Sequence, residues 1–156
     1  MKMLCHGSPW LRQVWLLDSL RKRCDFVQGA LARLGISNAQ TLWGRAETLG
    51  QDAAHRGSYD VAVARAVADM RVLSELCLPF VRTGGHLVAA KGPDPAAEVA
   101  AAKHAFDVLG GRLVDVMKVE SLSEEGLPRT AVIVRKDMQT PEEYPRREGK
   151  PSKRPL

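Results

Sequence analysis

Short apolar, β-branched runs alternate along this chain with stretches whose apolar residues recur every three or four positions. The first pattern is typical of strands, and the second is typical of helices with one buried face. Strands that alternate with helices pair mostly in parallel, because each helix carries the chain back across the sheet. We therefore expect an α/β fold with a largely parallel sheet and helices on both faces. The 156 residues suffice for one domain with a core.

The boundaries of these elements follow from caps, glycines and apolar spacing. The expected strands are 11–17, 39–43, 59–67 and 86–90, and the expected helices are 19–34, 47–55, 69–80 and 94–109. The runs 113–119 and 131–134 have no helix between them, so we expect an antiparallel hairpin at one sheet edge. Past Asp137 the composition changes to Pro, Arg, Lys and Glu. We assign 1–137 to the domain and 138–156 to a basic, Pro-rich tail that cannot bury enough surface to fold alone.

Charge and composition limit the partners of the chain. The net charge of +5 favours a polyanionic partner, and the cations concentrate at 21–23 and from Arg135 to the end. No apolar run approaches the roughly 18 residues of a membrane span, so no membrane contact is expected. Cys5, Cys24 and Cys77 form no C-x-x-C motif and have no metal-ligand spacing with the histidines, so we expect idle thiols and no metal site. The start of the chain lacks the apolar segment of a secretory signal. Its lack of acids before Asp18 leaves a transit peptide as an alternative.

Asp18 is the first candidate for chemistry, because it follows an apolar strand and precedes a basic helix. A carboxylate just past the carboxyl end of a strand lies where open α/β sheets bind ligands, and it accepts hydrogen bonds well from the two hydroxyls of a ribose. The alternative is a structural role, in which Asp18 helps Ser19 to cap the helix and favours its positive end. The sequence leaves both interpretations open.

Three further positions follow strands in the same way. The segment 43–47, W-G-R-A-E, offers backbone amides and the Glu47 carboxylate to a nucleobase, or it is a plain helix start with an acidic first turn. Arg65 ends a strand that we expect to be buried, so its guanidinium needs either an acid such as Glu47 or Asp69, or a ligand. Lys91 ends the next strand, where a phosphate contact is expected. No catalytic acid–base pair can be identified.

Taken together, these blocks resemble the RsmG (GidB) family of S-adenosylmethionine-dependent 16S rRNA guanine-N7 methyltransferases. The similar stretches are V-x-L-L-D-S-L-R-K-R at 14–23, W-G-R-A-E at 43–47, Y-D-V-A-V-A-R-A-V-A at 59–68, L-x-L-P-F-V-x-x-G-G at 76–85, A-K-G at 90–92 and T-P-x-x-Y-P-R-R-x-G-x-P at 140–151. They occur in the family's order and cover nearly the whole chain from about Pro9. The A-A-K-G and V-R-K-D segments are most similar to those of plant plastid members.

The resemblance assigns roles to individual residues. It implies that Asp18, Ser19 and Leu20 lie along the ribose of S-adenosylmethionine, that Ala46 and Glu47 meet its adenine, and that Arg65 is a further cofactor-site residue. Lys91, Arg146, Arg147 and Lys150 are the implied phosphate contacts with RNA. The implied reaction transfers the sulfonium methyl group to N7 of a guanosine. That nitrogen already carries a lone pair, so no base is needed and orientation supplies the catalysis; the catalytic residues stay unknown.

The start of the chain departs from the family. Members carry an N-terminal helical region, a first strand and a loop like G-x-G-x-G-x-P-G, none of which is present. We therefore expect a Rossmann-like class I methyltransferase sheet that lacks its first, central strand and its Gly-rich loop. Such a loss leaves backbone donors and acceptors unpaired in mid-sheet. Accordingly, we expect this truncated chain to bind S-adenosylmethionine weakly or not at all.

The expected partner is 16S rRNA or the small ribosomal subunit, and the expected state is a monomer. The cytoplasm is the expected compartment, or the plastid stroma if a full-length form is of the plant type. Two alternatives remain: a non-catalytic RNA-binding fragment that uses 21–23 and the tail, and half of a nicotinamide-dependent dehydrogenase. The second fits Asp18 but explains neither W-G-R-A-E nor the tail.

Overall fold

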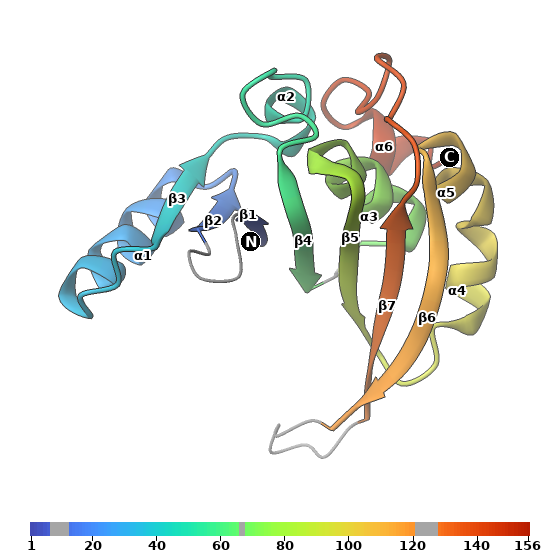
Figure 1. Ribbon diagram of the computed structural model, residues 1–156, viewed down its shortest axis with the longest axis horizontal. Coiled ribbons are helices and arrows are strands. Elements are labelled where there is room, and N and C mark those ends of the chain that lie inside the picture. The colour runs from blue at the N-terminus through green and yellow to red at the C-terminus, as the bar shows by residue number, and fades with distance from the viewer. Residues whose placement is uncertain (7–12, 66–67, 121–127) are drawn as a thin grey trace.

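A computed structural model describes residues 1–6, 13–65, 68–120 and 128–156 of the chain (Figure 1). The strands are β1 (Lys2–His6), β2 (Gln13–Asp18), β3 (Ala39–Trp43), β4 (Tyr59–Arg65), β5 (Val81–Lys91), β6 (Gly111–Val119) and β7 (Arg129–Lys136). The helices are α1 (Arg21–Arg33), α2 (Ala46–Leu49), α3 (Met70–Cys77), the 3-10 turn η1 (Leu78–Phe80), α4 (Ala96–Ala101), α5 (Lys103–Val108) and α6 (Lys150–Lys153). No helix in these described ranges has the length and apolarity needed to cross a bilayer.

The described strands form one mixed sheet in the order β3-β2-β1-β4-β5-β7-β6. β2 pairs in parallel with β3, and β4 pairs in parallel with β5. β6 and β7 form the expected antiparallel hairpin at one edge. This arrangement confirms the predicted Rossmann-like α/β class.

The central position of the sheet is filled, which corrects the expectation that it would be missing. β1 lies between β2 and β4 and runs antiparallel to both, with Leu4 opposite Trp15 on one side and Ala62 on the other. Leu4 is fully buried. The start of the chain therefore supplies the backbone partners that a gap between β2 and β4 would have left unsatisfied.

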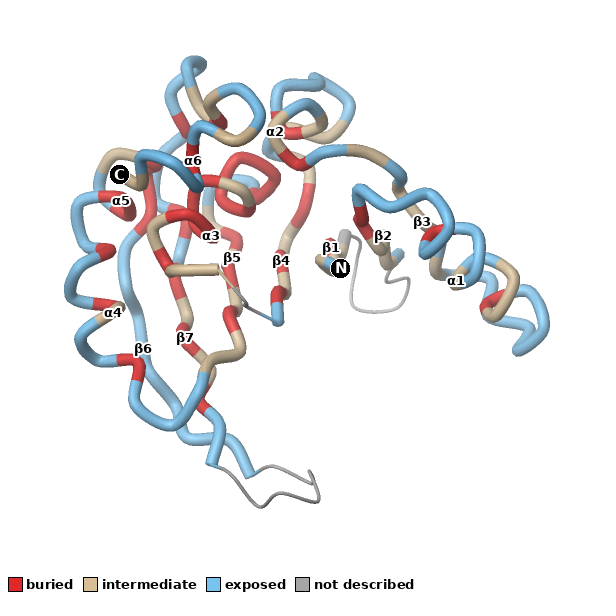
Figure 2. The backbone as a smooth tube through the Cα atoms, turned by 180° about the vertical axis from the view of Figure 1, so that it is seen from behind, coloured by how far each residue is buried: buried red, intermediate tan, exposed pale blue. Residues whose placement is uncertain are grey.

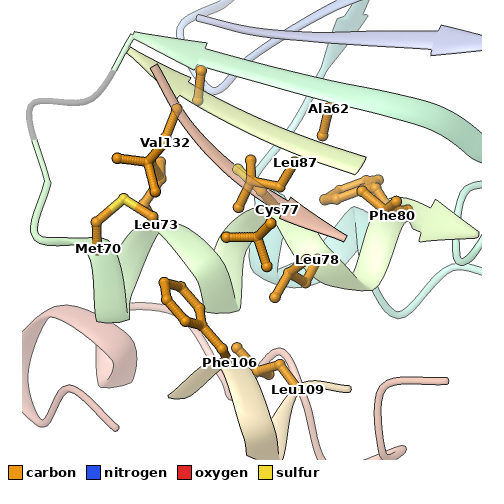
Figure 3. Packing of buried hydrophobic residues seen from close by; sticks show 14 of the residues in the cluster. Ala62, Met70, Leu73, Cys77, Leu78, Phe80, Leu87, Phe106, Leu109 and Val132 are labelled. Carbon is orange, nitrogen blue, oxygen red and sulfur yellow. The ribbon is translucent and has the colours of Figure 1, made fainter. Parts of the chain in front are cut away.

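The hydrophobic core lies between one face of the sheet and helices α3 and α5 (Figure 3). Leu87 of β5 and Val132 of β7 point from the sheet toward Leu73 of α3 and Phe106 of α5. All four side chains are buried. Because side chains alternate along a strand, Leu87 and Ala89 are buried here while Val88 and Ala90, on the other face, are only half-buried.

The opposite face of the sheet carries α1, but only over β2 and β3. Thr41 of β3 is hydrogen-bonded by its backbone N–H and its hydroxyl to the Gln28 side chain of α1, so α1 covers the face on which Thr41 lies. On this face, a row of residues that are partners on neighbouring strands crosses the sheet. It runs from Thr41 through Leu16 and Met3 to Val63, Val88 and Ile133. The β4, β5 and β7 members of this row are half-buried, and Figure 2 shows buried and intermediate residues alternating along these strands.

Several boundaries differ from the predictions for local reasons. α1 begins at Arg21 with Leu20 as its N-cap, so Ser19 does not cap it. α2 is a single turn, whereas a helix over 47–55 was expected. The expected helix 94–109 is divided into α4 and α5 at Ala102. Residues 11–12 and 66–67, at the ends of two predicted strands, lie outside the described ranges.

The tail 138–156, whose composition predicts that it cannot fold alone, packs on the domain. Pro145 and Pro151 are buried, and α6 contacts α3. The guanidinium of Arg56 donates to the carbonyl oxygens of Thr140 at 2.8 Å and Tyr144 at 2.7 Å. The tail therefore folds because the domain provides the donors and the apolar surface that it lacks.

Candidate cofactor site

A cavity of about 230 Å³ lies where β2 and β3 end. Its lining residues are Met1, Lys2, Leu17, Asp18, Ser19, Gly44, Arg45, Ala46, Glu47, Leu76 and Ser152. The structure thus brings together four of the six predicted cofactor residues, from two segments that are far apart in the sequence. Leu20 and Arg65 do not line this cavity.

Asp18 is the charged centre of the cavity, and only 5% of it is exposed. One carboxylate oxygen, Oδ1, accepts the backbone N–H of Leu20 at 2.9 Å, which orders the start of α1. The other, Oδ2, accepts Nη1 of Arg23 at 2.7 Å. Asp18 therefore holds the N-cap residue Leu20 in place without capping α1 itself, and it also faces the cavity.

The carboxylate of Asp18 stays ionised. Burial raises its pKa, but the hydrogen bonds from Leu20 and Arg23 and the α-ammonium of Met1 outweigh burial, so the net pKa lies below the ordinary value. An ionised carboxylate is acceptor-only, which suits the two donor hydroxyls of a ribose.

The segment 43–47 closes the cavity from the side of β3. The backbone N–H of Gly44 donates to the carbonyl oxygen of Asp18 at 3.0 Å, which holds the two strand ends together. A Cβ at Gly44 would lie 2.7 Å from Cδ1 of Leu49, so a larger residue here would have to displace the Leu49 side chain. Ala46 is buried at the start of α2, and half-buried Glu47 accepts the backbone N–H of Gly149 at 3.4 Å.

The first residues of the chain occupy part of the same cavity. Because β1 runs antiparallel to β2, Met1 lies beside the end of β2, and its α-ammonium is 3.4 Å from Oδ2 of Asp18. Drug-sized ligands commonly occupy sites of roughly 300–1,000 Å³, so the cavity is smaller than a whole nucleoside-type cofactor needs. The ionised Asp18 carboxylate in it suits the ribose of S-adenosylmethionine.

Arg65 and Lys91 end β4 and β5 as predicted, but their surroundings differ from the expectation. Arg65 is exposed at the end of β4, so the argument that burial forces it to bind an acid or a ligand is wrong. Lys91 is nearly buried, and its ammonium is hydrogen-bonded to the carbonyl oxygen of Ala68 at 2.7 Å and to the Glu98 carboxylate. Lys91 thus ties the segment before α3 to α4, and it is not free for an RNA phosphate.

The predicted RNA contacts in the tail divide into two kinds. Arg146 is engaged internally, because its guanidinium forms a two-pronged ion pair with the buried Glu75 of α3. Arg147 and Lys150 are exposed and line a hollow of about 540 Å³ together with Lys153 and Arg154. The one acid in this hollow, Glu148, is paired with Arg45 at 3.0 Å. The hollow therefore remains strongly cationic.

Sequence reasoning missed the residues that hold the tail in place. Glu75 lies on the side of the expected helix 69–80 opposite the apolar stripe of Met70, Leu73 and Cys77, so the pattern gave no signal that it is buried. Arg56 and Gln51 lie in the turns after α2 and gave no signal. The Gln51 amide donates to the carbonyl oxygens of Glu142 at 2.9 Å and Pro145 at 3.1 Å.

Comparison with known proteins identifies the lineage. Residues 8–126 match the family model described as GidB, rRNA small subunit methyltransferase G. The chain belongs to this family. It is 51% identical over 140 residues to ribosomal RNA small subunit methyltransferase G of Deinococcus radiodurans and 48% identical over 148 residues to that of Symbiobacterium thermophilum. Each match covers 90% of this chain but only 55% and 59% of the relatives, so the chain spans little more than half of their length.

Solved structures of other methyltransferases share the fold of this chain. An rRNA methylase from Streptococcus thermophilus aligns with a TM-score of 0.53 and 20% identity over 81% of this chain and 74% of its own. A geranyl diphosphate methyltransferase in complex with SAM aligns with a TM-score of 0.56 and 12% identity over 80% of this chain and 68% of its own. These likenesses show the Rossmann-like α/β fold.

Proposed function

We propose that this chain acts in the S-adenosylmethionine-dependent methylation of guanosine N7 in small-subunit (16S) ribosomal RNA. The observation that carries the proposal is the cavity in which Asp18, Ala46 and Glu47 meet in a member of the methyltransferase G family. The cofactor, when bound, supplies the methyl group as a sulfonium. The residues of the chain bind the cofactor and orient the guanine toward its methyl group.

Each residue has a separate task in this proposal. The ionised Asp18 accepts the ribose hydroxyls, for which the α-ammonium of Met1 has to withdraw from Oδ2. The start of α2, at Ala46 and Glu47, lies against the adenine. Guanine N7 carries a lone pair and no hydrogen, so alignment of the base with the methyl group is sufficient for attack.

Binding of the product cofactor tests the first half of the proposal. Isothermal titration of the 156-residue chain with S-adenosylhomocysteine and with adenosine is expected to show weak binding, because the cavity is small, and Asp18→Asn is expected to weaken it at least tenfold further. Asp25→Asn is the matched control, because Asp25 is an exposed acid on α1 outside the cavity. Equal affinities for both variants would contradict the role of Asp18.

Methyl transfer tests the second half. We expect labelled methyl groups to pass from S-adenosylmethionine to small subunits that lack the modification, and the product to be cleaved at N7-methylguanosine by borohydride and aniline. Label at any other atom would contradict the N7 assignment.

The alternative function is RNA binding without catalysis. The position of Met1 and Lys2 in the cavity favours it, since they reduce the space for a cofactor. This alternative would be supported if the chain binds RNA while isothermal titration shows no heat of cofactor binding.

A further inference from the structure

Exposed apolar side chains gather beside the mouth of the cavity, at the start of α1 and the end of β3. Leu20 is 55% exposed, Phe26 is 70% exposed and Trp43 is 54% exposed. Scattered apolar residues on a surface need no explanation, but a contiguous group indicates a binding surface. Leu20 and Phe26 line one hollow of about 450 Å³ together with Arg21, Lys22 and Arg23.

Trp43 joins this group through two contacts. The Arg21 guanidinium lies 4.7 Å from the centre of the Trp43 ring, in a cation–π arrangement. The indole N–H donates to the carbonyl oxygen of Ser19 at 3.3 Å. We call the surface formed by Leu20, Arg21, Lys22, Phe26 and Trp43 the α1 platform.

The charge of the α1 platform is positive. Arg21 has one acid near it, Asp25, at 4.0 Å, and both side chains are 67% exposed, so this pair neutralises little. Lys22 is exposed and has no acidic partner among the residues that the structure describes. Aromatic faces beside free cations are the chemistry that binds single-stranded nucleic acid, in which bases stack and phosphates pair.

The α1 platform adjoins the candidate cofactor site. Ser19, which accepts the Trp43 indole, and Gly44, which follows Trp43, both line the cavity. A base that enters an active site has to leave its stack, so its neighbours in the strand need support outside the pocket. The α1 platform is placed to provide that support.

We propose that the α1 platform binds the unpaired nucleotides next to the target base, with bases stacked on Trp43 and Phe26 and phosphates at Arg21 and Lys22. This inference rests on the proposed RNA substrate but not on cofactor binding. It differs from the cationic hollow of the tail, which lacks exposed aromatic rings and is suited to phosphates alone.

Fluorescence anisotropy with a single-stranded RNA oligonucleotide and a duplex of equal length tests the proposal. Because base–aromatic stacking is worth about 1–3 kcal/mol per base, Phe26→Ala and Trp43→Ala are each expected to weaken single-strand binding roughly 5- to 150-fold and to leave duplex binding nearly unchanged. Trp43→Phe keeps a ring and is expected to retain most of the affinity. Leu34→Ala is the matched control, since Leu34 is a 73% exposed apolar residue at the other end of α1.

The salt dependence separates stacking from charge. Lys22→Ala is expected to reduce the slope of log affinity against log salt by about one and to affect both RNAs. The proposal is overturned if Phe26→Ala and Trp43→Ala change RNA affinity no more than Leu34→Ala does. It is also overturned if they weaken binding of the duplex and of the single strand equally. A third result would overturn the proposal in favour of a protein partner. In that case the chain would bind RNA-free ribosomal proteins, and Phe26→Ala would abolish this binding but leave RNA affinity unchanged. Phe26 does not line the cavity, so Phe26→Ala is expected to keep the affinity for S-adenosylhomocysteine, and failure of cofactor binding and failure of the α1 platform are therefore distinguishable.

Discussion

The ion pair between Glu75 and Arg146 gives the sharpest test of how the tail is held. The Glu75 carboxylate is fully buried, and it accepts the backbone N–H of Arg146 at 2.8 Å, Nε at 2.8 Å and Nη2 at 2.6 Å. The hydrogen bonds to this carboxylate raise the pKa of the Arg146 guanidinium, so Arg146 stays charged. Arg146→Ala removes the two side-chain hydrogen bonds and leaves a buried charge with one partner.

The expected loss follows from these contacts. A hydrogen bond to a charged group contributes about 1.5–3 kcal/mol, and removal of one partner of a buried pair costs about 3–5 kcal/mol. We expect Arg146→Ala to lower the free energy of unfolding by about 3–5 kcal/mol. Arg146→Lys keeps the charge but not the forked geometry, so it should lose an intermediate amount.

Urea denaturation followed by circular dichroism measures this loss, with Arg147→Ala as the exposed control. Surface substitutions of that kind change stability by about 0.5 kcal/mol or less. The double variant Glu75→Met/Arg146→Met replaces the pair by apolar side chains and is expected to recover most of the stability. A loss below about 1 kcal/mol for Arg146→Ala, or a double variant no better than the single one, would refute the reasoning.

Three further predictions concern buried residues: Lys136, the two buried cysteines and Phe106. Burial, with a contribution from Arg56, lowers the pKa of Lys136 to about 7. The unfolded chain therefore binds an extra proton above pH 7, and stability should rise between pH 7 and 9 by up to about 1.4 kcal/mol per pH unit; Lys136→Met should flatten this rise in urea titrations. Burial also raises the pKa of the Cys24 and Cys77 thiols, so both should react with a thiol reagent only after unfolding, as mass spectrometry of labelled peptides would show. Phe106→Ala should cost about 3–5 kcal/mol in the same urea assay, and a smaller loss would mean that the α5 contact is loose.

The part of the site that the sequence predicts correctly depends on local rules. Asp18 and Gly44 each follow a strand, and parallel neighbours end at the same sheet edge, so their proximity follows from the pattern alone. Ala46 and Glu47 come with Gly44 because they begin the next helix. No knowledge of long-range contacts is needed for these four residues.

The rest depends on contacts between distant segments. Met3, Leu4 and Cys5 form too short an apolar run to reveal a strand, and no local rule gives the direction of β1. Arg146 and Glu75 are 71 positions apart, so the Pro- and Arg-rich composition of the tail does not show that it packs on the domain. The exposure of Arg65 likewise depends on what covers the end of β4, which the strand pattern does not specify.

The direction of β1 has a practical consequence for handling the protein. Because β1 runs opposite to β2 and β4, any residues joined ahead of Met1 emerge beside Asp18 and the cavity. An affinity tag fused there would compete with a small ligand for the space that a binding assay sets out to measure. Leu156, in contrast, follows α6, where Arg154 and Lys153 line the cationic hollow, so a tag at that end would interfere first with RNA. The choice of fusion end thus decides which of the two binding properties can be measured faithfully.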